Sequence, residues 1–446
     1  MKETLDLWLE TQTNPEELLA MNLRNARVTF SDNMDEPIHR WFRFPAGFSA
    51  RFAQMFLKLF TPSNDSLVLD PFTGCGTTNV VAKTLKIQSI GVEKHPFLAW
   101  VAKIKVRDYN IKEELKVCID KVLSDVRRKL SNVNINDFDI ESKPELLHKC
   151  YSKQILCELY AIKQYIEETF NDNEVRDFFM LALICILRKV TTVDVGWPYI
   201  LPKKKKKKRL VPVYDAFKEQ LLMMWQDLRT VNYDPKVQAD IYEADARAMS
   251  FIDDNSIGVA FTSPPYLNNY DYADRTRLEL YFLGWASSWR EITEKIRKKL
   301  IVSCSHQAKE VGLKEGLLPD KKVDSEVREK LIEASKQLRS IKRSKGGKKD
   351  YDIMVVAYFN DMLKAMEEVY RVLKDGAYFG MVLGDSAPYG VHIPTDEFLA
   401  KIGKSIGFRE AKIFVLRDRG TKWTYVAKSG RRHSVKLRES LVLFRK

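Results

Sequence analysis

The chain has 446 residues, of which 45% are hydrophobic and 30% charged, a composition that excludes a small scaffold and favours an ordered, soluble protein. Its 74 Lys and Arg residues outnumber 60 Asp and Glu residues, and the net charge of +14 favours a polyanionic partner, nucleic acid before membrane. We see no apolar stretch long enough to span a membrane and no leader before the polar N-terminus, so we expect a cytoplasmic protein without a membrane partner.

Six cysteines lie far apart in the sequence, without the CxxC or Cys/His spacing of a zinc site. Neither a metal centre nor a disulfide framework has this arrangement, so we predict reduced thiols and no metal site. The six are Cys75, Cys118, Cys150, Cys157, Cys185 and Cys304.

The first predicted helix lies in the segment FSARFAQMFLKLF, residues 48–60. Ser49 stands at its start, where a serine hydroxyl can accept a hydrogen bond from the first turn. Apolar residues recur on one stripe at helical spacing, which predicts a helix packed in the core. They are Phe48, Phe52, Met55, Phe56 and Leu59.

Residues 66–93, SLVLDPFTGCGTTNVVAKTLKIQSIGVE, predict one βαβ unit. An apolar strand is followed by a glycine-rich turn, a helix that begins near Thr77, and a second strand that ends at Glu93. Gly74 and Gly76 let the backbone turn sharply and a ligand approach. Glu93 stands seventeen positions after Gly76, where a carboxylate can accept both hydroxyls of a ribose.

Two kinds of nucleoside ligand, a dinucleotide and S-adenosylmethionine, are candidates for this βαβ unit. Dinucleotide binding needs a third glycine and a helix N-terminus open to pyrophosphate, but Thr77 and Thr78 occupy that region and Asp70 stands at its entrance. An acid there suits an ammonium better than a phosphate. S-adenosylmethionine carries an ammonium, a ribose, an adenine and a sulfonium but no phosphate, and it is the ligand we favour.

A second strand pair is predicted around residues 241–262. A strand-like segment leads to a third acid, Asp245, and the apolar run IGVAF then precedes TSPPY, residues 262–266. This order places the two prolines just beyond the carboxyl end of a parallel strand, where open α/β sheets bind ligands. Prolines fix φ and lack a backbone donor, so we predict a stiff extended loop that holds Ser263 and Tyr266 in place.

The C-terminal third begins with a helical pattern at residues 355–375, which Gly376 should end before the strand AYFGMVLGD, residues 377–385. Two last strands, AKIFVLRDRG and ESLVLFRK, are predicted to be joined by a basic turn from Arg417 to Arg438.

These motifs resemble those of amino-methyltransferases that act on DNA bases and transfer a methyl group from S-adenosylmethionine to an exocyclic nitrogen. DPFTGCGTT looks like the cofactor loop of that family, TSPPY like its catalytic loop, and HRWFRFPAGFSARFAQMFLKLF like its N-terminal cofactor-closing segment. The resemblance covers about half of the chain, residues 36–105, 236–290 and 353–446. A serine before the prolines usually goes with cytosine N4 in the family, and aspartate or asparagine with adenine N6.

The resemblance implies a role for each residue of the two loops. In the catalytic loop, the Ser263 hydroxyl and the Pro264 carbonyl would accept the amine hydrogens, Pro265 would stiffen the turn, and Tyr266 would stack on a base rotated out of the duplex. Asp70 and the loop after it would hold the methionine part of the cofactor, Glu93 the ribose and Asp245 the adenine amine. The implied cofactor residues are Phe44, Asp70, Pro71, Phe72, Thr73, Gly74, Cys75, Gly76, Thr77, Glu93 and Asp245. Each acid could instead cap a helix or solvate a turn.

The predicted fold class is α/β, with a Rossmann-like methyltransferase sheet that is mostly parallel and has an antiparallel C-terminal strand. Residues 1–105 would hold the N-terminal segment and the first half of the sheet with the cofactor loop, 236–285 the catalytic half, and 353–446 its C-terminal part. A helical insertion at 106–235 and a basic insertion at 286–352 interrupt the sheet. The usual family positions for target recognition have no room here, so we expect recognition to come from one or both insertions, with the helical one a candidate for target recognition and the basic one a candidate for DNA contact.

A run of seven positive charges between Pro202 and Pro212 is the strongest sequence signal for phosphate contact. A polyanion would relieve the repulsion within the run, although a solvated loop is the usual fate of such a segment. The predicted DNA-binding residues are Lys203, Lys204, Lys205, Lys206, Lys207, Lys208 and Arg209.

Three function classes follow from these residues. The first is a site-specific DNA methyltransferase that acts on duplex DNA. Its preferred target is cytosine N4, and adenine N6 is the alternative. A cognate restriction or defence nuclease encoded elsewhere would be compatible with this function. The second is an RNA base amino-methyltransferase, and the third an inactive nucleic-acid-binding relative. The chain has no Pro-Cys pair, which methylation at cytosine C5 would need.

Overall fold

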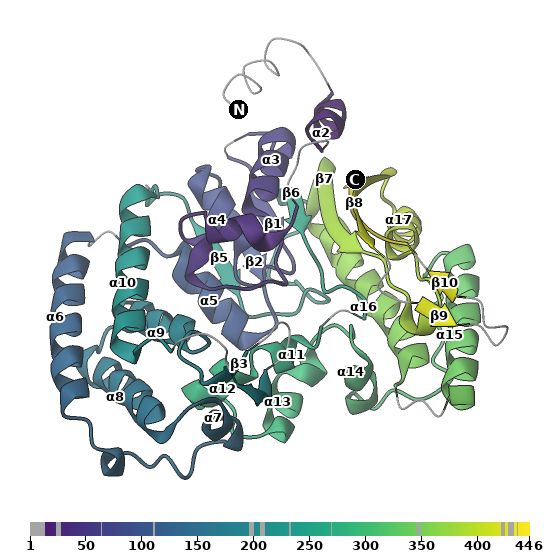
Figure 1. Ribbon diagram of the computed structural model, residues 1–446. Coiled ribbons are helices and arrows are strands. Elements are labelled where there is room, and N and C mark those ends of the chain that lie inside the picture. The colour runs from purple at the N-terminus through teal and green to yellow at the C-terminus, as the bar shows by residue number, and fades with distance from the viewer. Residues whose placement is uncertain are drawn as a thin grey trace.

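The computed structural model describes residues 14–446 except 24–27, 64, 110–111, 196–199, 206–209, 232, 269, 346–348, 421–423, 427–431 and 435. Within the described part, the largest sheet has seven strands (Figure 1). The strands lie in the order β5-β2-β1-β6-β7-β11-β8. Their bounds are β1 Val68–Asp70, β2 Ser89–Val92, β5 Ala239–Tyr242, β6 Ile257–Thr262, β7 Leu373–Gly384, β8 Glu410–Gly420 and β11 Leu437–Arg445.

Strand directions in this sheet follow the prediction. β1, β2, β5, β6 and β7 pair parallel to one another, whereas β11 pairs antiparallel with both β7 and β8. Alternate residues of one strand pack on opposite faces: Leu441 and Leu443 of β11 join one apolar cluster, and Val442 and Phe444 join another. The fold is therefore α/β with a mostly parallel sheet and an antiparallel C-terminal strand.

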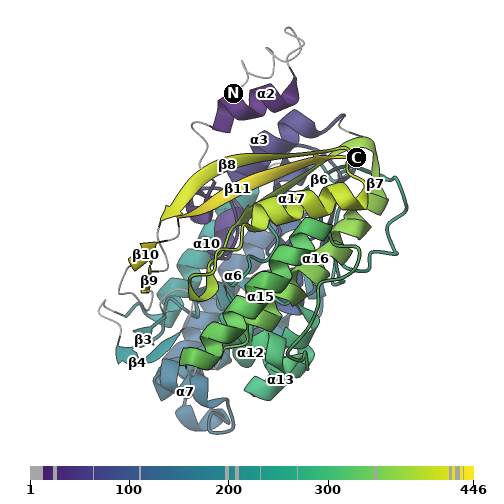
Figure 2. The same cartoon turned by 90° about the vertical axis from the view of Figure 1, so that its right-hand side faces the viewer.

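Helices cover both faces of the sheet. On one face the apolar residues of α3 and α4 pack against β1, β6 and β7, and on the other face α16 and α17 pack against β6, β7 and β11. Figure 2 shows α15, α16 and α17 on the same side of the strands β8 and β11, below them in that view. The bounds of the covering helices are α2 Pro15–Leu23, α3 Ala50–Phe60, α4 Thr77–Thr84, α5 Pro96–Val106, α16 Tyr351–Val372 and α17 Thr395–Ile406.

The segment between β2 and β5 forms a helical lobe beside the sheet, on the left in Figure 1. A large apolar cluster joins these helices to α5, so the lobe shares one core with the edge of the sheet. Its elements are α6 Lys112–Ser131, η3 Ile135–Asp137, α7 Glu145–Cys150, α8 Lys153–Thr169, α9 Asn173–Ile186, α10 Val213–Thr230 and the short antiparallel pair β3 Val193–Asp194 and β4 Leu201–Lys205.

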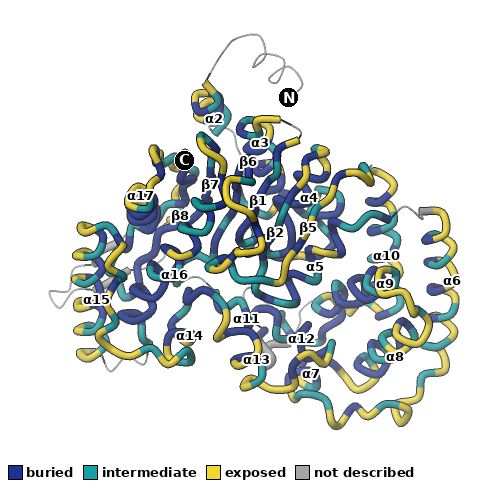
Figure 3. Tube along the Cα trace, turned by 180° about the vertical axis from the view of Figure 1, so that it is seen from behind, coloured by how far each residue is buried: buried dark blue, intermediate teal, exposed yellow. Residues whose placement is uncertain are grey.

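The segment between β6 and α16 divides into two parts. Its first part contains α11 Tyr272–Arg275, α12 Arg277–Leu283, α13 Trp289–Lys295, η4 Arg297–Lys299 and α14 Ser305–Glu310. Its second part is one long helix, α15 Ser325–Lys345, which packs against α16 and has an exposed outer side (Figure 3). The predicted basic insertion therefore forms two structural parts, a set of short helices and the long helix α15.

Local sequence signals account for the starts of α3 and α4. Ser49 caps α3, since its hydroxyl accepts a hydrogen bond from the Phe52 backbone nitrogen at 3.2 Å, and α4 begins at Thr77, as predicted. The predicted end of the 355–375 helix was wrong. α16 ends at Val372 because Leu373 already pairs with Ile257 of β6.

The connection between the last two strands differs from the predicted basic turn, because it contains further strand structure. β8 continues to Gly420, and the described residues after it include a small antiparallel pair, β9 Thr424–Val426 and β10 Arg432–Ser434. All six cysteines are free thiols, as predicted. Among the described residues, no helix has the length and apolar character needed to cross a bilayer, and no cluster of His, Cys, Asp and Glu could hold a metal ion.

A buried carboxylate joins the N-terminal segment to the helical lobe. Asp227 of α10 is 1% exposed and accepts hydrogen bonds from the Ile38 backbone nitrogen at 2.9 Å and from the indole nitrogen of Trp41 at 3.1 Å. Arg40 completes the set with an ion pair at 2.5 Å. The two sequence-distant segments are therefore held by one side chain that accepts hydrogen bonds from three residues.

We expect Asp227→Ala to lower the free energy of unfolding by about 3 kcal/mol, because it leaves buried donors and a cation without their acceptor. Urea unfolding followed by circular dichroism measures this. The neighbouring exposed Gln226→Ala is the matched control and should change stability by less than about 0.5 kcal/mol. Equal effects of the two substitutions would show that Asp227 does not join the segments as described.

Candidate active site

A cavity opens at the carboxyl ends of β1, β2, β5 and β6. Its walls come from the segment before α3, from the loops after these four strands, and from the stretch around η4. Ligands commonly bind at this position in parallel sheets. The lining residues are Phe44, Ala46, Gly47, Phe48, Pro71, Phe72, Thr73, Gly74, Cys75, Thr77, Val92, Glu93, Lys94, His95, Leu98, Asp245, Ala246, Ser263, Pro265, Tyr272, Lys299, Leu300 and Ile301.

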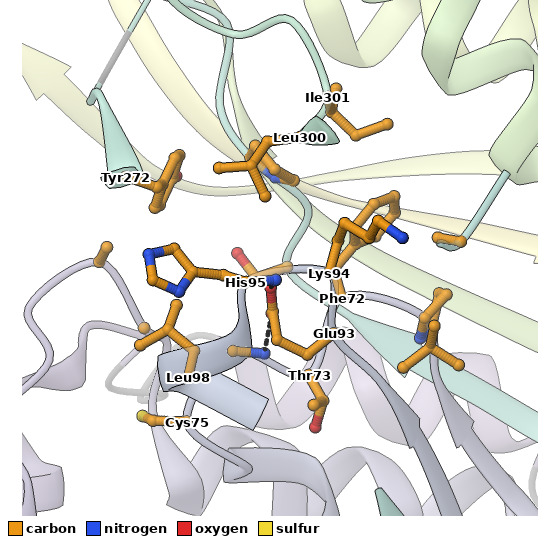
Figure 4. Close-up of a pocket in the computed structure, with 18 of the residues that line it drawn as sticks. Phe72, Thr73, Cys75, Glu93, Lys94, His95, Leu98, Tyr272, Leu300 and Ile301 are labelled. Carbon is orange, nitrogen blue, oxygen red and sulfur yellow. Dashed lines mark hydrogen bonds between the residues drawn. The ribbon is translucent and has the colours of Figure 1, made fainter. Parts of the chain in front are cut away.

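Glu93 projects into this cavity from the end of β2 (Figure 4). One carboxylate oxygen accepts a hydrogen bond from the Gly74 backbone nitrogen at 2.8 Å, and the other accepts one from the His95 backbone nitrogen at 2.7 Å. Burial nevertheless raises its pKa to about 7. The carboxylate is thus fixed against the glycine loop in an environment that disfavours its charge.

The glycine loop turns as the sequence predicted. Gly74 and Gly76 have φ of 54° and 88°, in the left-handed region that favours glycine. A Cβ atom on Gly76 would lie 3.2 Å from the Cβ of Ala102 in α5. The second glycine therefore serves helix packing as well as the turn, and it does not line the cavity.

Asp70 lies behind the loop and does not line the cavity. It is fully buried and accepts hydrogen bonds from the Phe72 backbone nitrogen at 3.0 Å and the Thr262 hydroxyl at 2.5 Å. Burial raises its pKa to about 6, and its second oxygen has no partner among the described residues. Asp70 thus ties the cofactor loop to the start of the TSPPY loop, and its contact with a ligand stays a prediction.

The TSPPY loop begins where β6 ends, and two of its residues line the cavity. Ser263 and Pro265 face the same space as Gly74 and Glu93, whereas Pro264 is buried. Tyr266 is not among the lining residues. Its hydroxyl donates to a carboxylate oxygen of Glu439 at 2.8 Å, and the guanidinium of Arg419 lies 5.5 Å from its ring centroid. The predicted stacking of Tyr266 on a base would use the part of the ring that Arg419 leaves free.

Asp245 lines the cavity just beyond β5, as the predicted strand order requires. The Arg247 side chain donates to both of its oxygens, at 3.0 and 2.8 Å. Burial alone would raise the pKa of Asp245, but the hydrogen bonds from Arg247 outweigh it and the pKa is lowered. A carboxylate at this position remains charged at neutral pH.

Several cavity residues were not predicted from the sequence. Tyr272, Leu300 and Ile301 lie across the pocket from Thr73 and Cys75 in Figure 4, and no motif marks them. His95 follows Glu93 by two positions. Its Nε2 lies 2.8 Å from the Thr276 hydroxyl, its Nδ1 has no partner among the described residues, and burial lowers its pKa to about 3.

The remaining predicted residues fall in two groups. Phe44 lines the cavity, as does Thr77 at the start of α4. The side chains of the predicted DNA-binding run, residues 203–209, lie outside the part of the chain that the structure describes.

A mostly parallel sheet with this strand order, one reversed C-terminal strand and a cavity at its carboxyl edge is consistent with a Rossmann-like methyltransferase fold. Residues 2–103 match the sequence model of the N6/N4 family described as "DNA methylase". Type II methyltransferase M.BsoBI of Geobacillus stearothermophilus is 28% identical over 94% of this chain and 87% of its own length. Type II methyltransferase M.AvaI of a Nostoc strain is 25% identical over 92% and 86%.

Two weaker similarities complete the comparison. Type II methyltransferase M.MjaII of Methanocaldococcus jannaschii is 26% identical over 32% of this chain and 31% of its own length. Among solved structures, the rRNA methyltransferase aviRa from Streptomyces viridochromogenes aligns over 94% of both chains with 12% identity and a TM-score of 0.30. With the sheet topology, the sequence matches support an amino-methyltransferase of the N4/N6 family.

We expect the ionisation of Glu93 to make the ligand-free protein less stable as the pH rises. The pKa of this carboxyl is 4.5 ordinarily and about 7 in the fold, so the folded protein holds the proton more tightly and the free energy of unfolding falls between these pH values. Glu93→Gln cannot ionise. Above pH 7 it should be more stable than the wild type by up to about 3 kcal/mol, an advantage that vanishes near pH 4.

Thermal unfolding at pH 4, 6 and 8 without added ligand measures this difference. Some pH dependence will remain in the variant because the pKa of Asp70 is also raised, from 3.8 to about 6. A stability difference between Glu93→Gln and the wild type that is the same at all three pH values would contradict the assignment.

Proposed function

We propose that this protein transfers a methyl group from S-adenosylmethionine to an exocyclic amine of a base in double-stranded DNA, with cytosine N4 as the preferred target. The observation that carries the proposal is the shared cavity, which brings Ser263 and Pro265 of the TSPPY loop together with Gly74 and Glu93 of the glycine loop. A donor and an acceptor of the methyl group need such a common space.

The residues around the cavity fit S-adenosylmethionine. Glu93 would accept hydrogen bonds from the ribose hydroxyls and Asp245 one from the adenine amine, while Phe44, Leu98 and Ile301 offer apolar walls. A cationic ligand would also favour the ionised form of Glu93, whose pKa is raised by burial. When bound, the cofactor supplies a methyl group on a positively charged sulfur.

The TSPPY loop would activate the acceptor amine. An amine conjugated to a base ring is a poor nucleophile, and hydrogen-bond acceptors on its two hydrogens free its lone pair for in-line attack. Ser263 lines the cavity and offers a hydroxyl oxygen, and the Pro264 carbonyl is the second acceptor we propose. Because the target amine is paired in duplex DNA, the base must leave the helix to reach this cavity.

Duplex DNA as the substrate is supported by the family description and by charge. The matched sequence model is that of a DNA methylase, and the relatives are named Type II methyltransferases. The net charge of +14 favours a polyanion. We propose that two regions contact the DNA: the helical insertion, and the part of the basic insertion around η4, which includes Lys299 at the cavity. We also propose that a restriction nuclease with the same target is the functional partner.

We expect the wild type to transfer labelled methyl from S-adenosylmethionine to duplex DNA and not to RNA of the same sequence. Ser263→Ala should lower kcat by about a hundredfold through the loss of one acceptor, with the Kd for S-adenosylmethionine unchanged. Digesting the product to nucleosides distinguishes N4-methylcytosine from N6-methyladenine. Preferred transfer to RNA, or none to either polymer, would refute the proposal.

The proposed activity should depend strongly on salt. Phosphate contacts release counterions, so we expect kcat/KM for duplex DNA to fall by about tenfold or more between roughly 50 and 200 mM salt. Binding of S-adenosylmethionine alone, measured by calorimetry over the same range, is the control and should change little. A salt-independent kcat/KM would mean that the basic surface does not contact the DNA backbone.

A further inference from the structure

A buried acidic side chain holds the tyrosine of the TSPPY loop from behind. Glu439 of β11 is 6% exposed, and one of its oxygens accepts the hydrogen bond of the Tyr266 hydroxyl at 2.8 Å. Its other oxygen forms an ion pair with Arg417 of β8. Both carboxylate oxygens of Glu439 are therefore occupied by donors that lie outside the cavity.

The strand geometry aims Glu439 at the loop. Glu439 pairs with Gly384, the last residue of β7, and with Arg417 of β8, and the register with β8 shifts both just before Arg438 and just after Glu439. Such bulges re-aim side chains beside active sites. A Cβ atom on Gly384 would clash first with the Arg419 guanidinium and would lie 3.2 Å from the Tyr266 ring, so glycine there leaves room for both side chains.

These contacts fix the direction of a hydrogen-bond chain. A carboxylate paired with an arginine only accepts hydrogen bonds, so Tyr266 must donate its single proton to Glu439. The Tyr266 oxygen can then only accept from the Ser263 hydroxyl, which lies 3.4 Å away. Burial, with the Glu439 charge next, raises the pKa of Tyr266 well above its ordinary value, so the phenol keeps its proton.

We propose that Glu439 is a positioning residue for methyl transfer. By holding Tyr266 as a donor, it turns the Ser263 proton away from the cavity and leaves the lone pairs of that hydroxyl free to accept a hydrogen from the target amine. Arg419 supports the arrangement, since its guanidinium lies over the Tyr266 ring and donates to the Asp385 carbonyl at 3.1 Å. This inference rests on the function proposed above.

The test is a double-mutant cycle between Glu439→Leu and Ser263→Ala. Without the carboxylate, the Tyr266 proton is free to turn to Ser263, so we expect kcat for duplex DNA to fall about tenfold, with KM and the Kd for S-adenosylmethionine within about twofold. In the Ser263→Ala background the same substitution should change kcat by less than about twofold, because the group through which it acts is absent.

Tyr266→Phe is the second probe, because it removes only the hydroxyl and keeps the ring in its packing. It should lower kcat by a similar factor with Ser263 present and have little effect with Ser263→Ala. The matched control is Asp396→Leu, which removes another buried, ion-paired carboxylate next to β11, one that binds Arg438 and Ser440 and does not touch the TSPPY loop. It should lower the melting temperature and leave kcat within about twofold.

The outcomes separate the inference from the proposed function. A wild type that methylates DNA, with equal losses from Glu439→Leu in both Ser263 backgrounds, would overturn the inference alone. A wild type that transfers no methyl group to nucleic acid would overturn the proposed function and the inference with it. Should Glu439→Leu fail to fold, Tyr266→Phe with and without Ser263 decides the question.

Discussion

The candidate site depends on the parallel pairing of β1 with β6. Val68 and Leu69 pair with Val259 and Ala260, so two segments nearly two hundred positions apart end at the same edge of the sheet. The hydrogen bond from the Thr262 hydroxyl to the Asp70 carboxylate locks the two strand ends together in a buried environment. Without this register, the glycine loop and the TSPPY loop would not face a common cavity.

The helical lobe lies between the two halves of the site in sequence but does not interrupt the pairing of β1 with β6. The lobe leaves the sheet after α5 and returns at β5, which lies at the sheet edge beyond β2. Its apolar cluster is continuous with α5, so the insertion is anchored on the same core that supports the cofactor side of the cavity. A lobe fixed in this way can hold a constant orientation relative to the cavity.

Local sequence signals mark the residues that reach the cavity from the two loops. Gly74, Glu93, Ser263 and Pro265 sit in short motifs directly after apolar strands, and strand ends in a parallel sheet meet at one edge. The placement of Asp70 and Tyr266 behind their loops was not predictable, because an acid or a tyrosine in a motif does not reveal which way its side chain turns.

Other parts of the site had no local signal at all. Leu300 and Ile301 reach the cavity from a segment after η4, and Glu439 reaches the TSPPY loop through a strand that folds back between β7 and β8. Their positions are set by tertiary pairing, which a single sequence does not display. The end of α16 was misjudged for the same reason, since pairing of Leu373 with β6 overrides its helical spacing.

The position of β11 has a consequence for how the chain is made. This strand is the last of the sheet in sequence, yet it lies between β7 and β8 rather than at an edge. While the ribosome is still synthesising the C-terminal residues, β7 presents an open row of backbone donors and acceptors, and β8 has no neighbour to join. Until β11 pairs with β7 and β8, Glu439 cannot lie behind Tyr266.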